Sequence, residues 1–121
     1  MTSPPARTFR ELLVWQKSHA LVLLVYRSSA SFPKSELFGL SAQMRRAAVS
    51  VPANIAEAFG RTTRPDKGRL LNIAQGSLDE LRYYIVLSRD LGYSTDAALA
   101  EAAEEVGRML DAYRRKVVSA V

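Results

Sequence analysis

The 121-residue sequence contains no cysteine, which excludes disulfides, cysteine-ligated zinc or iron–sulfur centres and thiol catalysis. Histidine occurs once, at His19, so one chain cannot supply the two Glu-x-x-His pairs of a helical-bundle metal site. The sequence also lacks a His-Glu-x-x-His motif, a phosphate-binding Gly-x-x-x-x-Gly-Lys loop and a Gly-x-Ser-x-Gly nucleophile elbow. We therefore expect a protein that is not an enzyme and that uses no cofactor and no metal.

Long hydrophobic runs are missing as well. The longest strictly apolar run, 20–26, has seven residues, whereas a membrane-spanning helix needs about 20. Residues 1–7 contain Pro4 and Pro5 and show no charged-then-apolar signal pattern, so we expect a disordered N-terminal arm there. These features favour a cytoplasmic protein without a membrane partner.

The composition that remains is that of a globular protein, with 48% hydrophobic and 24% charged residues. The length suits one domain, which we place at 8–121. Lysine and arginine number 17 against 12 acidic residues, giving a net charge of +5 that favours an anionic partner without proving one. No segment alternates between apolar and polar residues with the two-residue period of a strand. The sequence therefore predicts an all-α fold.

Apolar residues at helical spacing predict a first helix over 9–31 and a second that begins near Ser41. We expect a capping box at the start of the first helix, in which Thr8 and Glu11 bond each other's backbone amides. The apolar spacing of the second helix continues past Pro52, which predicts a kink there rather than an end. Gly60 is then expected to end the second helix in the left-handed conformation.

A polar and basic connection, 61–69, leads to the third helix, with Thr63 placed to cap it. The third helix is expected to end near Leu91, with Gly92 as its terminator. Ser94 or Thr95 is expected to cap a fourth helix that runs nearly to the C-terminus. Four such helices with short to moderate connections predict an antiparallel up-down-up-down four-helix bundle.

Several motifs carry a resemblance to a known family. They are Val14-Trp15-Gln16-Lys17, the stretch from Phe38 to Arg61, Gly76-Ser77-Leu78-Asp79-Glu80-Leu81 and Asp90-Leu91-Gly92-Tyr93. Over about 9–117 the chain strongly resembles the bacterial 23S rRNA intervening-sequence protein family of four-helix bundles. It is also similar to the accessory variability determinants of diversity-generating retroelements, which are basic bundles that assemble as five-fold rings beside a reverse transcriptase and its RNA. The resemblance implies a homo-oligomer, and specifically a pentamer.

One polar stripe of the second helix recurs at spacings of three and four residues, so its members share a face. Two interpretations stay open: a water-facing stripe, and a structural stripe that forms a subunit interface or an anion-facing surface. In the second interpretation Asn54 and Glu57 bond each other and a neighbouring helix. The stripe consists of Gln43, Arg46, Ser50, Asn54 and Glu57, and it continues to Arg61.

Basic residues gather in two segments, one after the second helix and one at the end of the fourth. Because these two helices run in the same direction, both segments should lie at one end of the bundle. The alternatives are a solvated surface and a phosphate-binding patch, and scarce aromatics predict weak sequence discrimination. The candidate nucleic-acid-binding residues are Arg61, Arg64, Lys67, Arg69, Arg114, Arg115 and Lys116.

The favoured hypothesis is a non-catalytic, homo-oligomeric bundle that binds RNA or DNA as a ribonucleoprotein accessory protein. The alternative is a protein-interaction scaffold with a polypeptide partner and no nucleic acid. A small helix-turn-helix DNA-binding regulator is a weaker third hypothesis, because every expected helix is long.

Overall fold

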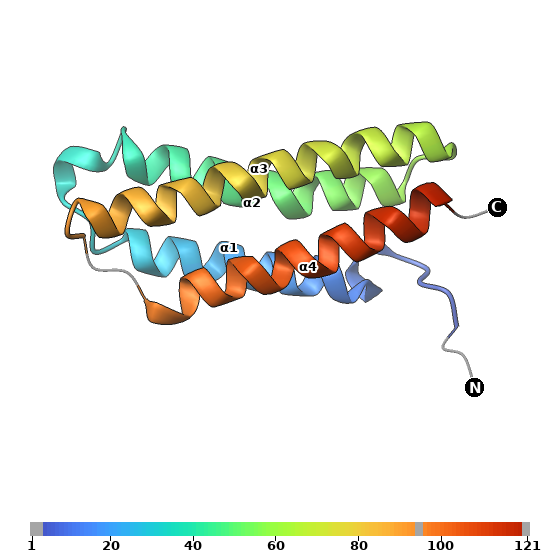
Figure 1. Ribbon diagram of the computed structural model, residues 1–121, viewed down its shortest axis with the longest axis horizontal. Coiled ribbons are helices and arrows are strands. Elements are labelled where there is room, and N and C mark those ends of the chain that lie inside the picture. The colour runs from blue at the N-terminus through green and yellow to red at the C-terminus, as the bar shows by residue number, and fades with distance from the viewer. Residues whose placement is uncertain (1–3, 94–95, 120–121) are drawn as a thin grey trace.

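A computed structural model describes residues 4–93 and 96–119, and it forms a bundle of four long helices (Figure 1). These are α1 (Leu13–Ser29), α2 (Leu40–Phe59), α3 (Arg64–Asp90) and α4 (Ala97–Ser119). Each helix packs against two neighbours, α1 on α2 and α4, and α3 on the same two. Within the described ranges there is no strand, so the predicted all-α, four-helix bundle is confirmed.

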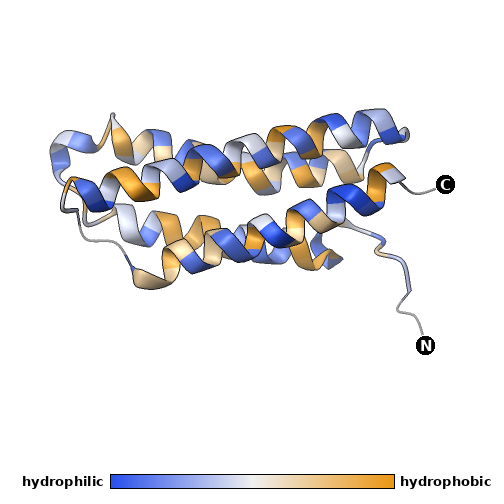
Figure 2. Ribbon diagram, viewed as in Figure 1, coloured by the Kyte–Doolittle hydropathy of each residue, from blue (hydrophilic) through white to orange (hydrophobic). Residues whose placement is uncertain are grey.

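A single apolar core runs along the axis of the bundle. Figure 2 shows hydrophobic and hydrophilic positions alternating along each helix, as expected when one side faces a core. Burying one large aliphatic side chain contributes about 1.5–3 kcal/mol, so these residues dominate the folding energy. The largest fully buried side chains include Leu21, Met44, Ile55, Leu71, Leu78, Leu81, Leu99 and Leu110.

The start of the first helix differs from the prediction. Leu12 has extended backbone angles (φ −75°, ψ 125°) and separates a short 3-10 turn, Phe9–Glu11, from α1. The predicted capping box is wrong, because Thr8 makes no side-chain cap and the Glu11 carboxylate instead accepts from the backbone N–H of Arg7 at 2.8 Å. A capping box needs Glu11 in the first turn of the helix, and α1 begins only after it.

The second helix contains Pro52 and continues without interruption to Phe59, as predicted. The predicted left-handed cap at Gly60 is wrong, because its φ of −82° is right-handed. Lys67 explains the difference, since its ammonium donates to the carbonyl oxygens of Ala58 and Phe59, each at 3.1 Å. A side chain of α3 thus satisfies carbonyls that a left-handed cap otherwise serves.

The third helix begins earlier than expected. Thr63 caps it as predicted, its hydroxyl oxygen accepting from the N–H of Asp66 at 3.3 Å. The predicted connection is therefore partly wrong, because residues 64–69 form the first turns of α3. At the other end Gly92 has a φ of +79°, which confirms its role as terminator.

The start of the fourth helix is capped from Asp96, whose carboxylate accepts from the N–H of Ala98 at 2.9 Å. The predicted caps Ser94 and Thr95 lie outside the described residues. No helix in the described part of the chain has both the length and the apolar character needed to cross a bilayer.

Candidate nucleic-acid interface

The two basic segments meet at one end of the bundle. Because the helices alternate in direction, α2 and α4 end where α3 begins (Figure 1, right). The predicted cations therefore share this end, but the structure divides them into groups with different partners.

Three arginines converge on one hollow. Arg64 and Arg69 from the first turns of α3 and Arg114 from α4 line a cavity of about 730 Å³, which we call the arginine pocket. None of the described residues that line it is acidic. The Nε atom of Arg114 is buried and has no hydrogen-bond partner among the described residues. The remaining lining residues are Pro65, Gly68, Asn72 and Val118.

Gly68 explains how the two helices come close enough to form this pocket. A Cβ atom at this position would lie 2.8 Å from Cγ1 of Val118, which is closer than nonbonded carbon atoms approach. The absent side chain lets the end of α4 pack against the start of α3. One lining residue of the pocket, Arg69, forms an ion pair with Asp66 at 3.8 Å, and both side chains are more than half exposed. Exposed pairs of this kind contribute little, so Arg69 stays available to an anion.

Three of the other predicted cations already have partners within the chain. Lys67 caps α2 and lies 5.8 Å from the centre of the Phe59 ring, which gives it a structural role. Arg61 pairs with Glu57 at 3.3 Å, and Arg115 pairs with Asp111 at 2.9 Å.

Lys116 is exposed and lies between Arg114 and Val118, the two residues of α4 that line the arginine pocket. Two residues along a helix correspond to about 200° of rotation, so Lys116 projects from the opposite side of α4. Lys116 is therefore turned away from the arginine pocket, which is lined by α3 and α4.

The polar stripe on α2 contacts α3 within the same chain. Gln43 accepts from the hydroxyl of Tyr84 at 2.8 Å, and the Ser50 and Ser77 hydroxyls lie 2.8 Å apart. Burial, together with the charge of nearby Glu80, raises the pKa of Tyr84.

Asn54 extends the network along α2. Its amide donates to the Ser50 carbonyl at 2.8 Å and to the Ser50 hydroxyl at 3.0 Å. The expected contact with Glu57 is replaced, because Glu57 pairs with Arg61. Arg46 is exposed to solvent, so this part of the stripe faces water.

Sequence reasoning missed the partners of the stripe on α3. Ser77 and Tyr84 are seven residues apart, as are Gln43 and Ser50. Polar residues with the same seven-residue spacing on two neighbouring antiparallel helices can pair with each other. This pattern could have predicted the hydrogen bonds between α2 and α3.

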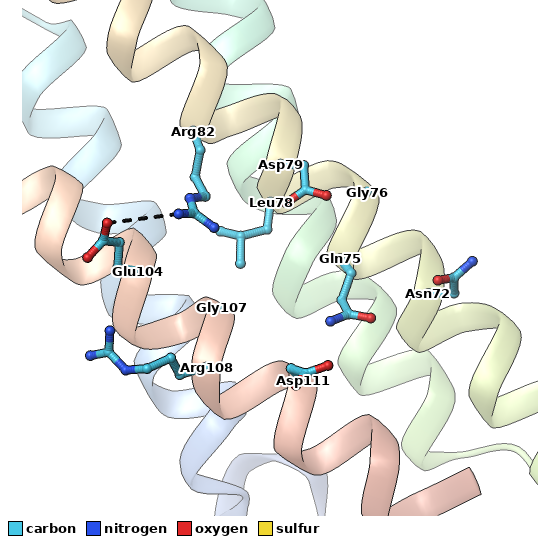
Figure 3. A pocket seen from close by; sticks show the side chains of 10 residues that line it. All are labelled: Asn72, Gln75, Gly76, Leu78, Asp79, Arg82, Glu104, Gly107, Arg108 and Asp111. Carbon is cyan, nitrogen blue, oxygen red and sulfur yellow. Dashed lines mark ion pairs between the residues drawn. The ribbon is translucent and has the colours of Figure 1, made fainter.

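Sequence reasoning also missed a second hollow between α3 and α4, the central groove (Figure 3). It measures about 730 Å³, and Asn72 lines both this groove and the arginine pocket, so the two hollows are neighbours on the α3–α4 seam. Arg82 reaches across from α3 to Glu104 of α4 at 3.9 Å. The groove is lined by Asn72, Gln75, Gly76, Leu78, Asp79, Arg82, Glu104, Gly107, Arg108 and Asp111.

The described residues include no group of three or more histidine, cysteine, aspartate or glutamate side chains placed to hold a metal ion. The cations and amides of the α3–α4 seam are suited to hydrogen bonding with an anionic, polar ligand.

Comparison with known proteins places the chain in a family. No curated protein matches the sequence significantly. A crystal structure from Bacteroides thetaiotaomicron, of a protein with unknown function from the S23 ribosomal protein family, has the same fold, with a TM-score of 0.77 and 24% identity over 85% of this chain and 96% of that one. The family model of the 23S rRNA-intervening sequence proteins matches residues 10–112. The chain therefore belongs to the 23S rRNA-intervening sequence protein family.

Proposed function

We propose that this protein is a non-catalytic, homo-oligomeric helical bundle of the cytoplasm that binds the phosphate backbone of RNA or DNA through the arginine pocket. The observation that carries the proposal is the convergence of Arg64, Arg69 and Arg114 on one hollow whose described lining is free of carboxylates. Guanidinium groups donate paired hydrogen bonds that match phosphate oxygens, and they keep their charge at every physiological pH.

Backbone contacts predict affinity that depends strongly on salt. Each phosphate neutralised releases counterions, with a slope of about −0.9 per contact on duplex DNA and about −0.7 on single strands. Nearby aromatics are not free to stack on bases, because Lys67 lies over the Phe59 ring and Tyr113 packs against the core. Binding should therefore discriminate weakly between base sequences.

Exposed apolar side chains support the homo-oligomeric part of the proposal. Leu23 of α1 is 48% exposed and Val49 of α2 is 41% exposed. Burial of such positions favours association. The resemblance to ring-forming accessory determinants supplies the proposed number of five subunits, which would repeat the arginine pocket around the ring.

Fluorescence anisotropy with labelled RNA and DNA, titrated against salt, tests the proposal. The double variant Arg64→Gln/Arg114→Gln should lose at least tenfold in affinity. The matched control is Arg27→Gln/Arg89→Gln, which removes the same amount of charge. Both arginines lie near the C-terminal ends of their helices, α1 and α3, at the end of the bundle away from the arginine pocket. Equal losses in both variants, or no binding by the wild type, would contradict the proposal.

A protein-interaction scaffold is the second candidate function. Phe38 is 92% exposed and neighbouring Leu37 is 52% exposed, in the segment between α1 and α2. This apolar pair lies at the end of the bundle away from the arginine pocket, because α1 ends and α2 begins there. Variants Phe38→Ser and Leu37→Ser should then release a bound polypeptide while leaving nucleic-acid affinity unchanged.

A further inference from the structure

We infer that the central groove receives unstacked bases of a single strand whose phosphates lie in the arginine pocket, so that the protein prefers single-stranded over duplex nucleic acid. The inference rests on the proposed function and adds the form of nucleic acid that the same seam accepts.

The first argument is that the two hollows are neighbours along α3. Asn72 lines both, and Arg69 and Gln75 are six residues apart on α3, or about 9 Å along the helix axis. A strand held by its phosphates at the arginine pocket thus reaches the central groove without leaving the α3–α4 seam.

The charges of the groove suit phosphate less well than those of the arginine pocket. Among the lining residues the carboxylates of Asp79, Glu104 and Asp111 outnumber the guanidiniums of Arg82 and Arg108, whereas the arginine pocket has no lining carboxylate. Carboxylates accept from the exocyclic amino groups of bases, which are neutral.

Side chains that bind base edges point into the groove. The amide of Gln75 reaches from α3 toward α4 (Figure 3), and an amide both donates and accepts. The planar guanidinium of Arg82 crosses the same space and can stack on a base. Such groups serve several bases, so the groove selects strand form rather than sequence.

Two glycines line the groove, and packing within the chain does not require either of them. A Cβ atom at Gly76 would meet nothing within 4 Å, and one at Gly107 would make ordinary contacts of 3.5 Å with Leu78 and 3.7 Å with Nη1 of Arg82. A glycine inside a helix is less favourable than alanine, so two that packing does not explain point to a close approach by something outside the chain.

A duplex cannot use the groove, because its bases are paired and stacked. Charge density alone favours the duplex, which presents more phosphates per length than a single strand. A preference for the single strand is therefore opposite to what the arginine pocket alone would produce.

The test compares a labelled 16-nucleotide unstructured RNA with the same RNA paired to its complement, by anisotropy at one salt concentration. The wild type should bind the single strand at least fivefold more tightly. Gly76→Gln, which fills the groove from an open position, and Gln75→Ala, which removes the amide, should each abolish that preference and leave duplex affinity unchanged. Thermal unfolding by circular dichroism verifies that each variant folds, and Ala53→Gln on the exposed surface of α2 is the matched control.

Duplex binding equal to or tighter than single-strand binding by the wild type would overturn the inference and leave the proposed function standing. Unchanged single-strand affinity in both folded groove variants would also overturn the inference and leave the proposed function standing. A polypeptide would then be the remaining candidate ligand of the groove. Absence of binding to either RNA would instead contradict the proposed function, and the inference with it.

Discussion

Gly68 of α3 faces Val118 of α4 so closely that a Cβ atom on the glycine would lie 2.8 Å from the valine Cγ1. This approach joins the start of α3 to the end of α4, at two positions that are fifty residues apart in the chain. It places Arg64 and Arg69 beside Arg114, and so forms the arginine pocket.

The Gly68–Val118 contact predicts a non-additive pair of substitutions. In a Val118→Ala background, Gly68→Ala should raise the free energy of unfolding by about 0.5–1 kcal/mol, the usual gain in a helix. In the wild type the new methyl group meets Val118, so the gain should vanish or reverse. Urea unfolding of the four proteins measures the coupling, and equal effects of Gly68→Ala in both backgrounds would contradict it.

Lys67 and Arg64 should separate stability from binding. Lys67→Ala removes two charge-assisted hydrogen bonds at the end of α2, so we expect a loss of about 1–3 kcal/mol in unfolding free energy and little change in RNA affinity. Arg64→Gln should lower RNA affinity and leave the free energy of unfolding nearly unchanged. Lys116→Ala is the control for loss of one lysine charge. Strong loss of RNA affinity on Lys67→Ala, with no loss of stability, would show that Lys67 binds phosphate.

The contact between Ser50 of α2 and Ser77 of α3 predicts which substitution along the polar stripe costs more stability. Ser50→Ala removes the contacts to both Ser77 and Asn54 and should cost about 1 kcal/mol. Asn54→Ala should cost less, because the amide bonds only Ser50 of its own helix. Thermal melting and light scattering check stability and oligomer mass. A larger loss of stability or assembly in Asn54→Ala would indicate a subunit contact at that residue.

Glu36 predicts a pH-dependent contribution to stability. Hydrogen bonds from the Tyr93 hydroxyl at 2.7 Å and the Leu40 N–H at 3.2 Å lower the pKa of the Glu36 carboxyl. The charged form is favoured in the folded state, so this stability is present above the ordinary glutamate pKa of about 4.3 and is lost as pH falls through the lowered value.

Urea unfolding of the wild type and Glu36→Gln between pH 3 and pH 7 measures that contribution. The difference should be constant from pH 6 to 7 and shrink below about 4.3. Tyr93→Phe should weaken the dependence, because it removes the principal cause of the lowered pKa. A difference that grows on acidification would have the wrong sign for this account.

Helical periodicity predicted all four helices because burial of one face dominates their stability. The exact ends of the helices were harder to predict, because they depend on contacts with residues outside the helix. The break at Leu12 accompanies an edge contact between Phe9 and Trp15, whose ring centres are 5.0 Å apart. Gly60 needs no left-handed cap because Lys67, seven residues later, reaches back to α2.

The candidate site was predictable only in part. Helix direction placed the basic residues at one end, but rotation of each helix about its own axis decided which of them meet. Arg114 lines the pocket, whereas its neighbour Arg115 points about 100° away and pairs with Asp111. The central groove depends on how α3 and α4 pack, which no local pattern encodes.

The salt dependence of RNA affinity, compared between the wild type and Arg64→Gln/Arg114→Gln, tests the central claim most directly. The slope of log affinity against log salt should be about −2 for the wild type with three single-strand phosphate contacts per pocket, and it should flatten by about 1.4 when two are lost. The Arg27→Gln/Arg89→Gln control should keep the wild-type slope. Equal slopes in all three proteins, or no RNA affinity at low salt, would contradict phosphate binding by the arginine pocket.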